Sequence, residues 1–89
     1  MKVVVLYHPN SEHEGKVLDY TREYQSQRPE TKFELLSLET PAGAEMAKLY
    51  DVTSYPAFLV IADDGQMEQL WQDEYLPPMK ELDYYTLPH

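Results

Sequence analysis

Two short apolar runs, one near the start of the chain and one about two thirds of the way along it, constrain the fold more than any other feature. They are Val3–Tyr7 and Ala57–Ala62. Side chains of a strand alternate between its two faces, so an unbroken apolar run is typical of a central strand that is covered on both sides. Both runs are far too short to span a bilayer. The sequence therefore predicts an α/β domain in which helices pack on both faces of a sheet.

The segments between these runs predict the remaining helices and strands. Val17, Tyr20 and Tyr24 recur at helical spacing and predict a helix over 12–27 that Arg28-Pro29 ends. Thr40-Pro41 places an N-cap hydroxyl before a proline, the favoured order at a helix start. The other predicted strands cover 32–38, 57–62 and 67–72, with a hairpin turn at 63–65. Two further helices are predicted, one from Pro41 to near residue 51 and one from Pro77-Pro78 to near residue 85. The order β-α-β-α-β-β-α over 89 residues predicts a single domain with its core at about 2–85 and a tail at 86–89.

The charge and the absence of one residue type exclude several classes of function. Sixteen acidic residues against seven basic ones give a formal net charge of −9, which disfavours nucleic acid and anionic membranes as partners. The chain has no cysteine, so thiol–disulfide exchange, disulfide bonds and sulfur-ligated metal centres are excluded. No signal-peptide pattern precedes the first strand, and a cytoplasmic location is the expectation.

The segment Ser11-Glu12-His13-Glu14 has the spacing of a helix start. In a capping box the serine oxygen accepts from the backbone N–H three residues on, and the glutamate carboxylate reaches back. Glu12 and Glu14 would also face the positive end of the helix dipole. The pattern predicts a cap formed by Ser11 and Glu14.

The strand and loop at 3–14, together with Val52-x-x-Tyr55-Pro56 and the apolar strand after it, resemble the thioredoxin-like and glutaredoxin-like fold superfamily. The resemblance implies a four-stranded mixed sheet and a cis peptide bond before Pro56, facing the start of the first helix. In those families a Cys-x-x-Cys motif occupies that helix start, and here Ser11 and Glu14 stand in its place. The chain is therefore similar to a member of this superfamily that lacks the redox dithiol.

The resemblance implies a groove that holds an extended peptide through the backbone next to the proline, much like strand addition at a sheet edge. The candidate binding residues are Tyr7, His8, Ser11, His13, Glu14, Tyr55 and Pro56. The expected function is a binding or scaffolding module with a protein or peptide partner, no catalytic residue and no cofactor, as a monomer or weak homodimer. The eight tyrosines exceed what the core needs, and Tyr75, Tyr84 and Tyr85 are candidates for an interface.

Two alternatives use the polar groups of the same segment. A small non-redox enzyme could draw on His8, Ser11, His13 and Glu14, although no glycine-framed nucleophile elbow accompanies the serine. His8 and His13 could instead bind a metal with help from a nearby glutamate, but their spacing matches no strong metal motif, and no metal site is expected. The pKa values of the two histidines discriminate these alternatives from a binding module, because catalytic groups titrate abnormally.

Overall fold

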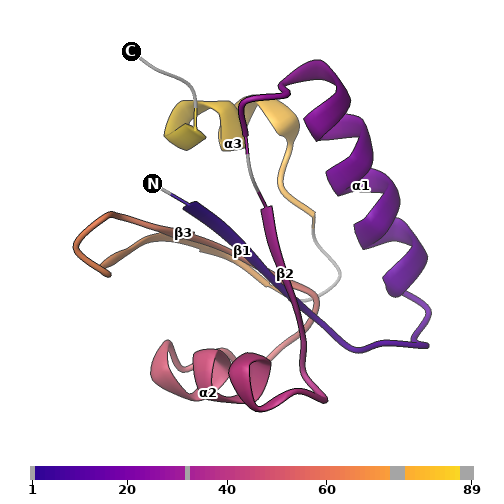
Figure 1. Ribbon diagram of the computed structural model, residues 1–89, viewed down its shortest axis with the longest axis vertical. Coiled ribbons are helices and arrows are strands. Elements are labelled where there is room, and N and C mark those ends of the chain that lie inside the picture. Colours follow the sequence, from indigo (N-terminus) through magenta and orange to yellow (C-terminus); the bar gives the residue numbers. More distant parts are fainter. Residues whose placement is uncertain (1, 32, 73–75, 87–89) are drawn as a thin grey trace.

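The computed structural model describes residues 2–31, 33–72 and 76–86. Within these ranges, strands and helices alternate in the predicted order, β-α-β-α-β-β-α (Figure 1). The elements are β1 (Lys2–Tyr7), α1 (Glu14–Gln27), β2 (Phe33–Ser37), α2 (Pro41–Leu49), β3 (Ala57–Ile61), β4 (Met67–Trp71) and α3 (Met79–Thr86). None of the described helices is long and apolar enough to cross a bilayer.

The strands form one four-stranded mixed sheet in the order β2-β1-β3-β4. β1 pairs parallel with β2 and antiparallel with β3, with Val5 opposite both Leu35 and Phe58. β4 pairs antiparallel with β3 and has an irregularity in register between Val60 and Ile61. The two apolar runs are therefore the two central strands, as the sequence predicts, and the more polar strands lie at the edges.

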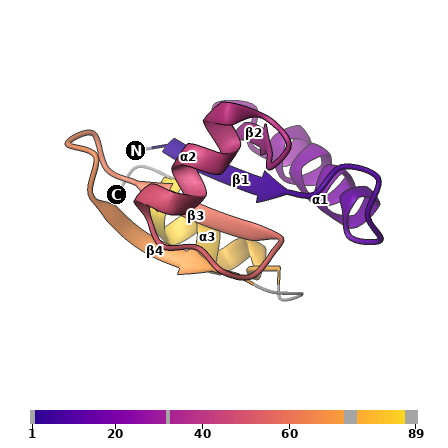
Figure 2. The same cartoon turned by 90° about the horizontal axis from the view of Figure 1, so that it is seen from below.

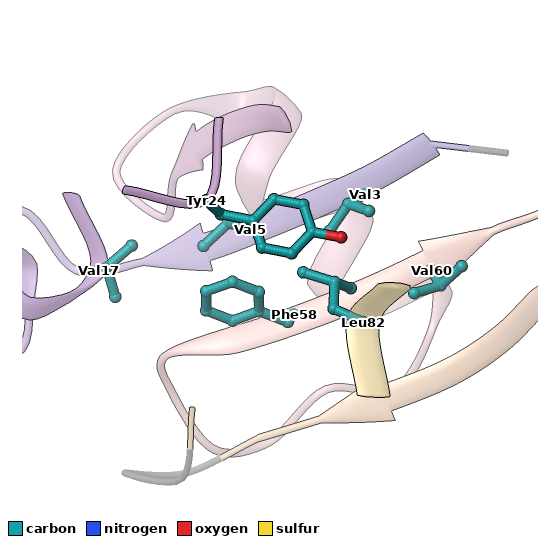
Figure 3. Packing of buried hydrophobic residues seen from close by; sticks show 7 residues of the cluster. All are labelled: Val3, Val5, Val17, Tyr24, Phe58, Val60 and Leu82. Atoms are coloured by element: carbon teal, nitrogen blue, oxygen red, sulfur yellow. The ribbon is translucent and has the colours of Figure 1, made fainter. Parts of the chain in front are cut away.

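Helices cover both faces of this sheet, α1 and α3 on one side and α2 on the other (Figures 1 and 2). On the first face, Tyr24 of α1 and Leu82 of α3 converge on Phe58 of β3 and the valines of β1 (Figure 3). On the second face, Ala47 of α2 packs with side chains from β1 and β3, among them Leu6 and Leu59. The alternation of the central strands divides their apolar side chains between these two layers.

The helix starts differ from the predictions in two of three cases. α1 begins at Glu14 instead of Glu12, and α3 begins at Met79 instead of at the preceding prolines. The cap of α2 is as predicted: the Thr40 side chain accepts a hydrogen bond from the Gly43 N–H at 3.1 Å. A Cβ at Gly43 would lie 2.1 Å from the Ser37 carbonyl oxygen, so α2 approaches the end of β2 too closely for any side chain there. The predicted strand position Lys32 and the tail residues 87–89 lie outside the described residues.

A polar cluster joins α1 to α3 beside the first layer of the core. The buried Tyr24 hydroxyl donates to Asp83 Oδ1 at 2.7 Å and lies 2.7 Å from the Thr86 hydroxyl. Arg28 makes a two-pronged ion pair with Asp83 and stacks over the Tyr24 ring at 4.3 Å. The hydrogen bonds from Arg28 lower the pKa of Asp83, and burial raises the pKa of Tyr24. We call Tyr24, Arg28, Asp83 and Thr86 the seam cluster.

Candidate functional site

A cleft of about 540 Å³ lies between the loop that precedes α1 and the segment that precedes β3. One wall is the loop 8–13, which we call the histidine loop, and the other is the segment 53–56. Leu76 adds an apolar side chain to the cleft, and Lys16 adds a cation from the first turns of α1. The described residues that line the cleft are His8, Ser11, Glu12, His13, Lys16, Thr53, Ser54, Tyr55, Pro56 and Leu76.

The histidine loop is closed by hydrogen bonds between its own residues. The Ser11 hydroxyl donates to the His8 carbonyl at 2.5 Å, and the His8 backbone N–H donates to His13 Nε2 at 3.1 Å. Asn10 has a φ of +60°, a left-handed conformation that asparagine tolerates better than most residues and that turns the chain back on itself. These bonds hold the loop as a unit at the end of β1.

The same bonds explain why the predicted capping box is wrong. The N-cap residue of α1 is His13, which makes no side-chain cap, and the Ser11 hydroxyl is directed to His8 instead of to the Glu14 N–H. The Glu14 N–H is bonded to the backbone carbonyl of Ser11 at 3.2 Å. Once the loop supplies a backbone acceptor for that N–H, the serine side chain is free to close the turn, and the helix starts later than its sequence pattern indicates.

His13 is held in its neutral form by this arrangement. Its Nε2 can accept the His8 N–H only while that nitrogen carries no proton, so the proton of the neutral ring lies on Nδ1. Burial lowers the pKa of His13, and the charge of His8 lowers it further against a weaker opposing effect of Glu14. The two imidazole rings lie 6.1 Å apart, and the His8 ring meets the edge of Tyr55 at 5.0 Å.

The opposite wall contains the turn that precedes β3. The Tyr55–Pro56 peptide bond is cis, and the Tyr55 hydroxyl donates to the Val52 carbonyl at 3.0 Å, which holds the ring in place. Within the described part of the chain, neither the backbone N–H nor the carbonyl of Tyr55 has a hydrogen-bond partner. Tyr55 is half-buried, lines the cleft and lies just before a central strand, and its backbone donor and acceptor are unpaired.

Most of the residues singled out from the sequence come together here. His8, Ser11, His13, Tyr55 and Pro56 all line the cleft, so the helix start and the proline turn face each other. Tyr7 and Glu14, both described, are not among its lining residues.

Five residues that line the cleft were not among the binding residues predicted from the sequence. They are Glu12, Lys16, Thr53, Ser54 and Leu76. The position of Lys16, one turn after His13 on the same helix face, was a signal that could have found it. Leu76 carried no such signal, because it reaches the cleft only through the tertiary fold.

The geometry gives little support to the two alternatives. The Ser11 hydroxyl is bonded to a carbonyl and not to an imidazole nitrogen, so no nucleophile–base pair is formed. One ring nitrogen of His13 is already occupied by the His8 N–H. Over residues 2–31, 33–72 and 76–86, no group of three or more histidine or carboxylate side chains is placed to hold a metal ion.

A second groove, of about 480 Å³, lies between β4 and α3 on another part of the surface. Tyr84 is 66% exposed and meets Tyr85 edge-on at 5.0 Å, and Trp71 meets Tyr85 in the same way at 5.9 Å. Of the three tyrosines expected at an interface, Tyr84 and Tyr85 therefore share one groove, and Tyr75 lies outside the described residues.

No protein-family model matches the chain, and no curated protein matches it.

Proposed function

We propose that this protein is a thioredoxin-like domain without redox chemistry that binds an extended segment of a protein or peptide in the cleft beside Pro56. The observation that carries the proposal is the unpaired backbone of Tyr55 at the cleft wall. An extended ligand that pairs with this N–H and carbonyl would gain backbone hydrogen bonds whatever its side chains are.

The position of the cleft supports the same proposal. It faces the start of α1 across the proline turn, where the resemblance to the thioredoxin-like superfamily implies a peptide groove. The strand order β2-β1-β3-β4, with helices on both faces, is compatible with that superfamily. Because the chain has no cysteine, the ligand would be held without a mixed disulfide, so its release needs no reductant.

The walls of the cleft indicate what the ligand would contact. Tyr55, His8 and Leu76 offer aromatic and apolar surface, while Thr53, Ser54 and Lys16 offer polar groups at the rim. In recognition by strand addition, backbone hydrogen bonds supply the affinity and pockets for alternate side chains supply the specificity.

The test is selection from a displayed library of random linear peptides at neutral pH, followed by affinity measurement on the selected peptides. The blocking variant is Thr53→Trp, because Thr53 is exposed and lines the cleft. The matched control is Ala44→Trp, which adds the same side chain at an exposed position of α2 on the other face.

We expect peptides that bind the wild type and Ala44→Trp equally and bind Thr53→Trp at least tenfold more weakly. Selected peptides that bind all three proteins equally would place the ligand elsewhere and overturn the proposal. Failure to select any peptide would count against it as well.

A further inference from the structure

We propose that the histidine loop is a proton-controlled wall of the cleft: protonation of His13 releases the His8 backbone and opens the loop. The hydrogen bond from the His8 N–H to His13 Nε2 joins the first residue of the loop to its last, at 3.1 Å. A protonated imidazole has no acceptor, so this bond cannot survive protonation.

The second hydrogen bond of the loop makes the response local. The Ser11 hydroxyl donates to the His8 carbonyl, so both polar backbone atoms of His8 are held by loop residues alone. His8 follows the last residue of β1, whose pairing with β2 and β3 does not depend on His13. Loss of the imidazole acceptor therefore changes the loop and not the sheet.

The charges around His13 come from its own loop, from α1 and from the opposite wall. Its neutral form is favoured by partial burial and by the charge of His8. Glu14 opposes this effect from the first turn of α1. Among the residues that the structure describes, the other titratable side chains at the cleft are Glu12, Lys16 and Tyr55. Because the pKa of His13 is lowered, the bond is complete at neutral pH and is lost as the pH falls below the ordinary histidine value of about 6.5.

The consequence for binding rests on the proposed function. The His8 ring touches Tyr55 across the cleft, so movement of His8 changes the space beside the backbone to which the ligand would pair. A peptide bound at neutral pH would then be released in acid. The loop transition itself requires no ligand and is tested without one.

The experiment follows nitrogen-15 and amide-proton NMR signals of the free protein between pH 8 and pH 4. We expect the His13 ring above its pKa to show the tautomer with a bare Nε2 and a protonated Nδ1. We expect the His8 amide signal to include a titration step, with a midpoint below about 6.5, that coincides with protonation of the His13 ring.

Two variants distinguish the effect of protonating His13 from any effect of His8. His13→Gln keeps a side-chain acceptor that does not protonate in this range, so the step that follows the His13 ring should disappear from the His8 amide. His8→Gln keeps the backbone N–H and removes a charge that lowers the pKa of His13, so the step should remain and move to higher pH. Far-ultraviolet circular dichroism at both ends of the range checks that all three proteins stay folded.

Three results would overturn the proposal: the opposite His13 tautomer, a His8 amide that does not respond to pH, or an unchanged step in His13→Gln. Because none of these measurements uses a peptide, they leave the proposed function untouched. A loop that titrates as expected in a protein that binds no peptide would refute only the proposed function.

Discussion

The seam cluster and the histidine loop are both built from polar side chains next to aromatic rings, but they connect very different parts of the chain. In the seam cluster, Tyr24 and Arg28 bond to partners 55 to 62 residues away, on α3. In the walls of the cleft, the bonds of His8, Ser11 and Tyr55 span three to five residues. The first set joins distant elements, and the second set shapes each wall separately.

Because of this difference, we expect the seam cluster to contribute to stability and the cleft to contribute to binding. The described residues include no hydrogen bond between the histidine loop and segment 53–56, and the His8 and Tyr55 rings meet edge-on between them. The histidine loop can therefore change shape without breaking long-range hydrogen bonds, whereas the bonds of the seam cluster link α1 to α3. Changes at the seam should alter the free energy of unfolding, and changes at the cleft should alter binding.

The largest effect is expected from removal of the Tyr24 ring. Tyr24→Ala deletes a fully buried aromatic side chain and the hydroxyl that bonds to Asp83, and should lower the free energy of unfolding by about 3–5 kcal/mol. Tyr24→Phe keeps the ring and should cost about 1 kcal/mol. Denaturant unfolding of the two variants measures both, and equal losses would show that the hydroxyl, and not the packed ring, joins the helices.

A smaller effect is expected from the charge of Asp83, and it should depend on pH. The pKa of Asp83 is lowered, so its contribution to stability is complete above the unfolded value of about 3.9 and is lost as the pH falls below it. Asp83→Asn should therefore be less stable than the wild type at pH 7 and should lose less stability on acidification. Asp19→Asn is the matched control, because Asp19 pairs with Arg22 on the exposed surface at 3.9 Å. Identical pH profiles for Asp83→Asn and the wild type would contradict the assignment.

The smallest change in the free energy of unfolding is expected for a substitution at the cleft. Ser11→Ala removes a bond to an exposed carbonyl that water can replace, and should change the free energy of unfolding by less than about 0.5 kcal/mol. Thr40→Ala removes a real N-cap on α2 and should cost about 1 kcal/mol. If the two thermal or denaturant midpoints moved equally, Ser11 would be acting as a cap after all.

The elements that the sequence predicted well are those that depend on local chemistry. The apolar runs correctly predicted both central strands, and Thr40-Pro41 correctly predicted the start of α2. Arg28-Pro29 correctly predicted the end of α1. The turn after β3 contains Gly65 with a φ of +92°, as its Asp-Asp-Gly sequence indicates.

The failures depend on contacts that no local pattern encodes. The seam cluster was not predicted, because Tyr24 and Asp83 meet only after α1 and α3 pack on the same face. The start of α1 was predicted too early, because the imidazole of His13 organises the loop before it. Leu49 is 73% exposed although it is apolar, whereas Ala47 and Tyr50 on either side of it pack against the second layer of the core.

The most direct test of the account is to map a selected peptide onto the protein by amide chemical shifts. We predict that the perturbed amides are those of Ser54, Tyr55 and the histidine loop, and that those of the α1–α3 seam stay in place. Perturbations confined to the groove of Trp71, Tyr84 and Tyr85 would instead show that the ligand binds between β4 and α3, and would contradict the assignment of the cleft beside Pro56.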